Sequence, residues 1–375
     1  MVKSLSIGPV LEAMRRRGIL VDREKLKVKS EKLRKEIRKL AAEIKKLAGE
    51  DFNLNSPRQL SRILFEKLKL VKGGRRTKTG LRSTSEAALD NLRGSHRIID
   101  KILQYREQFK LLSTYLEPWL KYSRASRDGR IHPTFLQDAT ATGRLTCQNP
   151  NLQNVPSQLR EVLVAAAGHT LISVDYSQIE LRVLATVTKD PALLEAFAKD
   201  LDIHQLTASK VFNVPLEKVT KEQRNLAKTL NFGVIYGMGA AAFARVSGLS
   251  RKEAEQFIEE YFLEFKKVRQ WQEKVKWELQ QNGYVENLEG QRRELGPGEE
   301  RAAINFPIQS LAAHIIKLAM IKTAKYPLLL SIHDQLVFEI EKGKIKGSSA
   351  AIKEIMESVY KLAVPLKVNV TLGSW

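Results

Sequence analysis

The stretches LISVDYSQIELR (171–182) and LLLSIHDQLVFE (328–339) set the architecture of this chain, because each contains an apolar strand that ends in an acid. The first strand ends at Asp175. The second is predicted to turn back on itself as a β-hairpin whose two-residue turn is His333-Asp334. If folding brings the two aspartates together, they form a site for two metal ions, which require hard oxygen ligands on a rigid backbone.

The composition favours a polyanionic partner. Among 375 residues, Lys and Arg total 63 and Asp and Glu total 42, so the net charge is +21. Nucleic acid is the leading candidate, because each phosphate that a protein neutralises releases condensed counterions. The single cysteine, Cys147, cannot form an intrachain disulfide, and no apolar run approaches the ~18 residues that cross a bilayer. The start of the chain lacks the apolar core of a signal peptide, so we expect a soluble cytoplasmic protein that does not bind membranes.

Two long helical patterns occupy the first third of the chain. Residues 26–49 form a charged helix with a narrow apolar stripe, which fits one arm of an antiparallel helix pair, and residues 86–122 supply the return arm. The stretch VKGGRRTKTGLRSTSE (71–86) between them is predicted to be a basic loop at the tip of the pair. It is either a solvated loop or a grip on duplex phosphates. The residues that would make this grip are Arg75, Arg76, Lys78 and Arg82.

Short strands and longer helical segments follow the second arm. A turn-rich polar stretch precedes the strand that ends at Asp175, and residues 191–279 are helical with breaks at Gly233, Gly237 and Gly239. A last helix then leads into the hairpin. Central strands with helices on both sides predict an α+β fold, and the sequence contains no internal repeat.

Between the two aspartates lies RNLAKTLNFGVIYG (224–237), in which two cations and then two aromatic residues recur every four positions: Arg224, Lys228, Phe232 and Tyr236. Each step of four turns a helix by ~400°, so all four lie along one slowly drifting face. Cations at one end of such a face can hold the β- and γ-phosphates of a nucleotide, and the rings can face its base and sugar. The alternative is an amphipathic helix whose aromatic side chains belong to the core.

These segments, in this order, resemble the polymerase core of the DNA polymerase I family, also called family A. The resemblance runs from about Ser6 to Trp375 and also covers Asp202-Ile203-His204 and TGRLTCQNPNLQNVP (142–156). It implies a right-hand fold with an antiparallel β palm, helical fingers and a helical thumb. The implied parts are a segment leading into the palm (1–20), the thumb (21–125), the first part of the palm (126–190), the fingers (191–290) and the second part of the palm (291–375).

The resemblance implies a template-directed DNA polymerase. Such an enzyme adds dNTPs to a primer 3′-hydroxyl by phosphoryl transfer with two Mg²⁺ ions, which Mn²⁺ can replace. The partners would be primer-template DNA and dNTPs, and the enzyme is expected to be a monomer. Because the thumb-like helices begin almost at Met1, no proofreading or 5′-nuclease domain is expected.

The family's functional residues carry over onto matching positions of this sequence. Glu180 would crowd the sugar 2′ position together with a tyrosine, which favours deoxynucleotides, and Phe232 implies discrimination against dideoxynucleotides. The implied metal ligands are Asp175, Asp334 and the backbone at Tyr176, and both aspartates and Lys228 would be catalytic. The implied nucleotide-binding residues are Gln178, Glu180, His204, Arg224, Lys228, Phe232 and Tyr236. The implied DNA-binding residues are Arg144, Asn151, Gln153, Asn154, Arg301, Asn305, Gln309 and His333, to which the basic loop adds Arg75, Arg76 and Lys78.

Departures from the family pattern leave two alternatives open. Gln335 stands where the family usually has glutamate, which removes one carboxylate near the metals. Ser310, Leu311 and His314 stand where a Gly-Thr-Ala-Ala-Asp pattern is common, and two loops are shorter than in the family. One alternative is a single-subunit RNA polymerase, against which Glu180 argues. The other is a catalytically silent DNA-binding protein that kept the fold, and Gln335 keeps this reading open.

Overall fold

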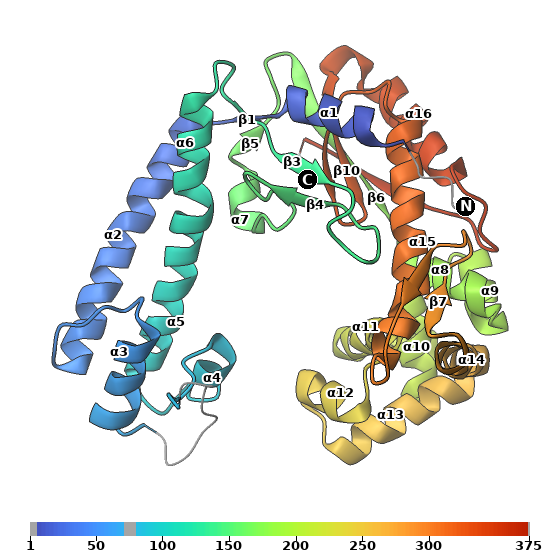
Figure 1. The fold of residues 1–375 in the computed structure, drawn as a ribbon, viewed down its shortest axis with the longest axis horizontal. Coiled ribbons are helices and arrows are strands. Elements are labelled where there is room, and N and C mark those ends of the chain that lie inside the picture. Colours follow the sequence, from blue (N-terminus) through green and yellow to red (C-terminus); the bar gives the residue numbers. More distant parts are fainter. Residues whose placement is uncertain (1–5, 71–79, 374–375) are drawn as a thin grey trace. The chain divides into compact units, whose positions relative to one another are not determined.

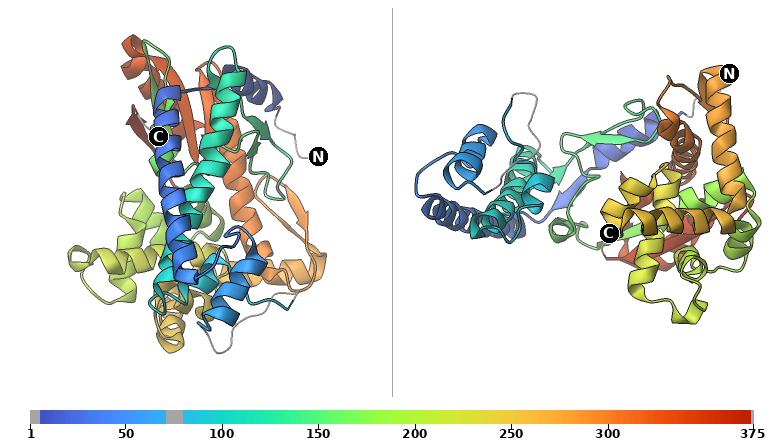
Figure 2. Two further views of the ribbon diagram at one scale, coloured as in Figure 1. Left: turned by 90° about the vertical axis from the view of Figure 1, so that its left-hand side faces the viewer. Right: turned by 90° about the horizontal axis from the view of Figure 1, so that it is seen from below.

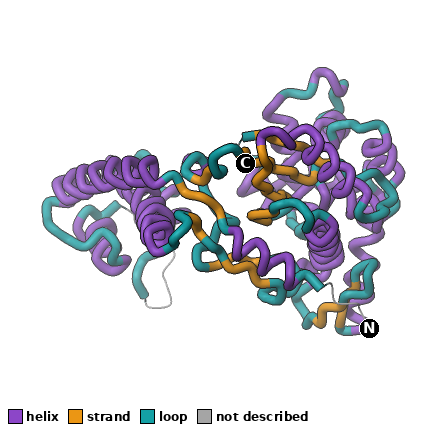
Figure 3. The backbone as a smooth tube through the Cα atoms, turned by 90° about the horizontal axis from the view of Figure 1, so that it is seen from above, coloured by secondary structure: helices purple, strands orange, loops and turns teal. Residues whose placement is uncertain are grey.

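The computed structural model describes residues 6–70 and 80–373. Its elements form two compact units, each of which combines segments that are distant in the sequence (Figure 1). Unit 1 consists of Met1–Gly18, His132–Pro156 and Ala165–Trp375, and unit 2 consists of Ile19–Ile131 and Ser157–Val164. Helices make up most of the described chain, as the tube in Figure 3 shows.

Unit 1 is built on a four-stranded antiparallel sheet in the order β11-β6-β10-β9. Its strands are β6 (His169–Tyr176), β9 (Leu328–Ile332), β10 (Gln335–Glu341) and β11 (Val368–Leu372). Helix α1 (Gly8–Arg17) packs on β9, every residue of which is buried, and α16 (Ile345–Ser358) packs on β6, β10 and β11. The chain turns between β9 and β10 at His333 and Asp334, so the predicted hairpin and the α+β class are confirmed.

A run of helices follows the first part of this sheet. It begins with α8 (Ile179–Thr188) and continues through α9 (Pro191–Ala198), α10 (Ile203–Val211), α11 (Lys221–Ile235), α12 (Ala240–Ser247), α13 (Arg251–Glu264) and α14 (Lys266–Asn282). Thr220 and Gln223 start α11 with a capping box, in which each side chain bonds the backbone N–H of the other.

The expected helix break at Gly233 is wrong, because α11 continues to Ile235. A Cβ at Gly233 would lie 2.9 Å from Sδ of Met238, so this glycine serves close packing inside the protein. The break falls at Gly237, whose φ of +61° suits glycine and whose Cβ would lie 3.2 Å from Cγ of Arg301. The two glycines therefore admit protein side chains.

Unit 1 also contains two further pairs of strands and its longest helix. They are β3 (Thr134–Leu136) with β4 (Thr146–Gln148), β7 (Tyr284–Glu286) with β8 (Arg292–Glu294), and α15 (Glu300–Lys322). By length and composition, α15 alone among the described helices could cross a membrane, but 67% of its apolar window is buried within the protein. Its apolar residues, among them Ile304 and Phe306, pack in a core with Val275 and Val285. We therefore interpret α15 as a helix of the protein core.

Unit 2 contains the antiparallel helix pair that the sequence predicts (Figures 1 and 2). Its first arm is α2 (Arg23–Ala48), and the return arm is an almost continuous helix from Arg97 to Ala125. The predicted start of the return arm at residue 86 is wrong, since the chain turns at Gly94 and His96 caps the new helix by accepting a hydrogen bond from Ile98. The elements of unit 2 are α2, α3 (Pro57–Ser61), α4 (Glu86–Asp90), α5 (Arg97–Lys110), α6 (Glu117–Ala125), α7 (Ser157–Arg160), two π-helical stretches (Arg62–Lys67 and Leu111–Leu116), β1 (Ile19–Val21), β2 (Arg130–Ile131) and β5 (Leu163–Val164).

The basic tip of the pair is only partly described. Arg75, Arg76 and Lys78 lie outside the described residues. Arg82 is described, and its guanidinium lies over the ring of Phe65, 5.4 Å from the centroid. The predicted grip on phosphates thus stays a prediction.

Candidate active site

Strand pairing brings the two aspartates together although 159 positions separate them in the sequence. Asp175, near the end of β6, lies directly opposite Gln335, the first residue of β10. The backbone N–H of Tyr176 donates a 3.1 Å hydrogen bond to the carbonyl oxygen of Asp334. Both acids therefore sit at the same end of the two central strands, held by the sheet.

Burial raises the free energy of the ionised forms of both acids. The pKa of Asp334 is raised to about 7, chiefly by burial; the nearby carboxylates Glu180 and Asp175 contribute to this rise, and Arg144 opposes it. Burial also raises the pKa of Asp175, against the opposing effect of His333. A cation placed between the acids would stabilise their ionised forms.

The donor set fits divalent metal ions. Oδ1 of Asp334 is buried and has no hydrogen-bond partner among the described residues, which is costly unless a cation binds there. Within residues 6–70 and 80–373 no group of three or more His, Cys, Asp or Glu side chains is arranged to hold a metal, so the protein ligands would be the two aspartates and backbone oxygen. The hydroxyl of Tyr176 is not available, because it is buried and donates to the carbonyl of Met356 at 2.7 Å.

Glu180, in the first turn of α8, joins predicted site residues from three other segments. Its carboxylate accepts a hydrogen bond from Nη2 of Arg144 and another, of 2.9 Å, from the hydroxyl of Tyr236. The side chain of Gln309 lies near the same hydroxyl and lowers its pKa. Burial and the neighbouring Glu180 raise the pKa of Tyr236, so its phenol keeps its proton and remains a donor. Gln178 lies at the start of the same helix with a left-handed backbone, φ +54°.

The predicted stripe on α11 is present, with Tyr236 as the residue that ends the helix. Arg224 forms an ion pair with Asp202, with Nη2 and Oδ2 2.7 Å apart, and Lys228 is exposed. Phe232 is half-buried, and its ring centroid lies 5.7 Å from that of His204. Cationic and aromatic groups thus follow one another along this face.

The tautomer of His204 is set by Asn231, which was not among the predicted site residues. Burial lowers the pKa of His204 to about 4, although Asp202 acts in the opposite direction. The imidazole is therefore neutral at pH 7. Nδ2 of Asn231 lies 3.1 Å from Nδ1 of His204 and can only donate, so Nδ1 accepts and the ring proton sits on Nε2.

Several predicted DNA-binding residues line one cavity of about 230 Å³ in unit 1. Nε2 of Gln153 donates to the carbonyl of Ser331 at 3.1 Å, which ties this loop to β9. Lys317 of α15, which was not among the predicted residues, also lines the cavity. The predicted residues that line it are Arg144, Asn151, Gln153, Asn154 and His333.

The positions that depart from the family pattern have defined partners. Nε2 of Gln335 donates to Oγ of Ser173 at 2.9 Å. Oγ of Ser310 accepts from Nδ2 of Asn287 at 2.8 Å, and Nε2 of His314 lies 3.7 Å from Oε2 of Glu289. Asn287 and Glu289 belong to the turn between β7 and β8, so Ser310 and His314 contact the same turn.

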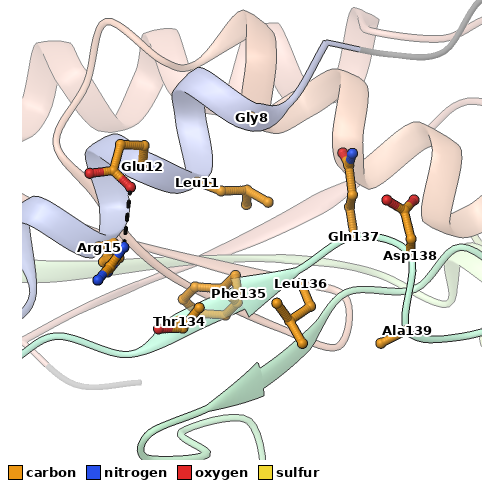
Figure 4. A pocket seen from close by; sticks show the side chains of 10 residues that line it. All are labelled: Gly8, Leu11, Glu12, Arg15, Thr134, Phe135, Leu136, Gln137, Asp138 and Ala139. Atoms are coloured by element: carbon orange, nitrogen blue, oxygen red, sulfur yellow. Dashed lines mark ion pairs between the residues drawn. The ribbon is translucent and has the colours of Figure 1, made fainter.

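A second cavity, of about 530 Å³, lies between α1 and the segment that starts at β3 (Figure 4). Leu11, Phe135 and Leu136 point into it, and Arg15 forms an ion pair of 3.7 Å with Glu12 at its edge. None of the residues predicted for metal, nucleotide or DNA binding lines it. The smaller cavity, in contrast, is lined by five of the predicted DNA-binding residues.

Comparisons with known proteins agree with one another. The profile of DNA polymerase family A matches residues 23–375. The chain is 45% identical over 391 residues to "DNA polymerase I, thermostable" of Thermus aquaticus, covering 98% of this chain and 47% of that protein. It is 42% identical over 399 residues to DNA polymerase I of Bacillus subtilis (strain 168), covering 99% of this chain and 45% of that protein. The chain thus spans about half the length of these relatives.

Among solved structures, the fold matches one described as "POL domain of Pol1 from M. smegmatis complex with DNA primer-template and dNTP". The TM-score is 0.91 and the sequence identity is 35%. The match covers 98% of this chain and 69% of that one.

Proposed function

Because the chain belongs to DNA polymerase family A, we propose that it is a template-directed DNA polymerase that adds dNTPs to a primer 3′-hydroxyl. The observation that carries the proposal is the pairing of β6 with β10, which sets Asp334 beside Asp175 and leaves Oδ1 of Asp334 without a partner among the described residues. Strong similarity to DNA polymerase I proteins supports it, as does the likeness to a domain solved with primer-template DNA and dNTP.

Asp175 and Asp334, with backbone oxygen at Tyr176, would hold two Mg²⁺ ions, which Mn²⁺ can replace. When bound, the metals activate the primer hydroxyl and neutralise charge on the transferred phosphoryl group. Lys228 and Arg224 bind the triphosphate, and Lys228 assists proton delivery to the departing pyrophosphate. The proposed nucleotide site is completed by Gln178, Glu180, His204, Phe232 and Tyr236.

Primer-template DNA is the proposed macromolecular partner. Unit 2 contains 30 Lys and Arg and 15 Asp and Glu, so 30 − 15 = +15 of the chain's net charge of +21 lies there. This concentration of charge supports a thumb at 21–125 that holds duplex phosphates. The palm would comprise 126–190 and 291–375, with 1–20 leading into it, and the fingers 191–290. We further propose that the protein works as a monomer in the cytoplasm.

Primer extension by the variants Asp175→Ala and Asp334→Ala tests the proposal. Each is expected to lower the extension rate by about a thousandfold, because the metals supply several kcal/mol of charge stabilisation and 1.36 kcal/mol is tenfold. Asp51→Ala removes an exposed acid of unit 2 that pairs with Lys45, and should extend primers normally. Normal extension by both active-site variants in Mg²⁺ would refute the assignment.

The same assay separates the alternatives. Parallel reactions with dNTPs, with rNTPs and without metal are expected to give extension only with dNTPs and metal. A preference for rNTPs would identify an RNA polymerase. Salt-sensitive binding of primer-template without turnover at any metal concentration would identify a silent DNA-binding protein.

A further inference from the structure

The cavity lined by Arg144 and Gln153 is chemically suited to an anion. Its described lining residues include two cations, Arg144 and Lys317, together with His333, and they include no carboxylate. Amide side chains, those of Asn151, Gln153 and Asn154, supply further donors. A cavity of this composition attracts a phosphate more strongly than a neutral group.

Lys317 is half-buried in this cavity without an ion pair. No carboxylate oxygen lies within 4.0 Å of its Nζ among the described residues, and the acid that acts on it from a greater distance is Asp138. His314, on the same helix, also faces it. Burial lowers the pKa of Lys317, which means that keeping this side chain protonated inside the protein costs free energy. An anionic ligand would offset that cost.

The position of Lys317 continues a pattern already assigned to DNA binding. Arg301, Asn305 and Gln309 recur every four residues on α15, and two further steps of four lead through the small residue Ala313 to Lys317. Nζ of Lys317 lies 3.6 Å from the point where a Cβ of Gly143 would stand, beside Arg144. Arg144 forms an ion pair with Glu180, whereas Lys317 forms no ion pair with any of the described residues.

We propose that Lys317 binds a backbone phosphate of the primer strand near its 3′ end, an inference that rests on the polymerase function proposed above. The primer strand is chosen over the template because His333 lines the same cavity and precedes Asp334, one of the two acids at which the primer hydroxyl would react. Lys317 acts as a point charge with three donors, which suits a phosphodiester. It is a positioning residue and takes no part in the chemical step.

The test is the salt dependence of primer-template binding, measured by fluorescence anisotropy in EDTA without dNTP. Lys317→Gln is expected to lower the slope of log K against log salt by about 0.9, the value of one phosphate contact, whereas Lys317→Arg keeps the wild-type slope. Lys322→Gln is the matched control, because Lys322 lies on the same helix but is exposed. It should leave the slope unchanged.

Uncharged backbone linkages in the primer identify the phosphate that Lys317 contacts. A methylphosphonate placed at one primer position at a time should, at one position near the 3′ end, abolish the difference between wild type and Lys317→Gln. An unchanged slope in Lys317→Gln, or a difference that maps to the template strand, would overturn the proposal. So would a lower melting temperature of Lys317→Met, since removing a costly buried charge should not destabilise the fold. If wild type binds as expected but never extends a primer, the polymerase function fails and the phosphate contact stands.

Discussion

The hydroxyl of Tyr236 donates a 2.9 Å hydrogen bond to Glu180, 56 residues earlier in the sequence. The second oxygen of Glu180 accepts from Arg144. One carboxylate thus joins the end of α11, the start of α8 and the loop before β4. Glu180 is almost fully buried, so its carboxylate depends on these two donors to offset the loss of water.

Glu180→Ala is expected to raise the ratio of rNTP to dNTP incorporation by about tenfold, because removing the acid opens space at the sugar 2′ position and small steric differences are worth about this factor. The measurement is kcat/KM for each nucleotide on one primer-template. Glu195→Ala is the control, since Glu195 is an exposed acid paired with Lys199. An unchanged ratio in Glu180→Ala would remove Glu180 from the sugar site.

Asp334→Asn should stabilise the metal-free protein above pH 7. The pKa of Asp334 is raised from 3.8 to about 7, so the folded protein binds this proton more tightly than the unfolded chain, and stability is lost as pH rises from about 4 to 7. The variant avoids this loss, which is at most about 4 kcal/mol at 1.36 kcal/mol per pH unit.

Thermal melts in EDTA test this expectation. The two proteins should melt alike at pH 4, and the variant should melt higher at pH 8. Adding Mg²⁺ should raise the melting temperature of wild type and narrow the gap. A variant that melts lower than wild type at pH 8 contradicts the account of Asp334 as a costly buried acid.

His204 should remain neutral, with its proton on Nε2, down to about pH 5. Its pKa is lowered to about 4, and Asn231 donates to its Nδ1. Because the unfolded residue titrates near 6.5, stability should fall as pH drops from 6.5 towards 4. His204→Gln should flatten that part of the stability profile. Nitrogen NMR of the ring checks the tautomer, and an Nδ1–H signal at pH 7 would contradict it.

Gln335→Glu should lower the Mg²⁺ concentration for half-maximal extension by about tenfold, the usual scale for groups that support metal ligands. Gln335 lies opposite Asp175 and donates to Ser173, whose hydroxyl can donate instead to a carboxylate, so the new charge costs no hydrogen bond. Gln335→Leu has neither the negative charge nor the hydrogen bond, so it should not lower the Mg²⁺ concentration for half-maximal extension. An equal or higher Mg²⁺ requirement in Gln335→Glu would show that this position does not act on the metals.

Local patterns predicted the local structure well. The apolar stretches on both sides of His333-Asp334 identified the hairpin, and the spacing of four from Arg224 to Tyr236 identified the face of α11. The errors came from glycine, whose effect depends on its surroundings. Gly233 lies inside a helix because Met238 packs against it, whereas Gly94 interrupts a segment that periodicity alone marks as helical. Lys317 had a signal, the continued spacing of four on α15, but its burial could not be read from spacing.

The order of residues along the chain was sufficient to predict most strands and helices and the excess of positive charge, because each depends on short-range periodicity or on residue type, while the motifs around the two aspartates and at residues 224–237 carried the resemblance to family A. Folding alone determined that Asp334 lies beside Asp175 with an unpaired buried oxygen, that Asn231 sets the proton position on His204, and that Lys317 faces the cavity of Arg144. These relationships join residues far apart in the sequence. They arise from strand register and helix packing, in which burial and the exclusion of water change the energy of every charge.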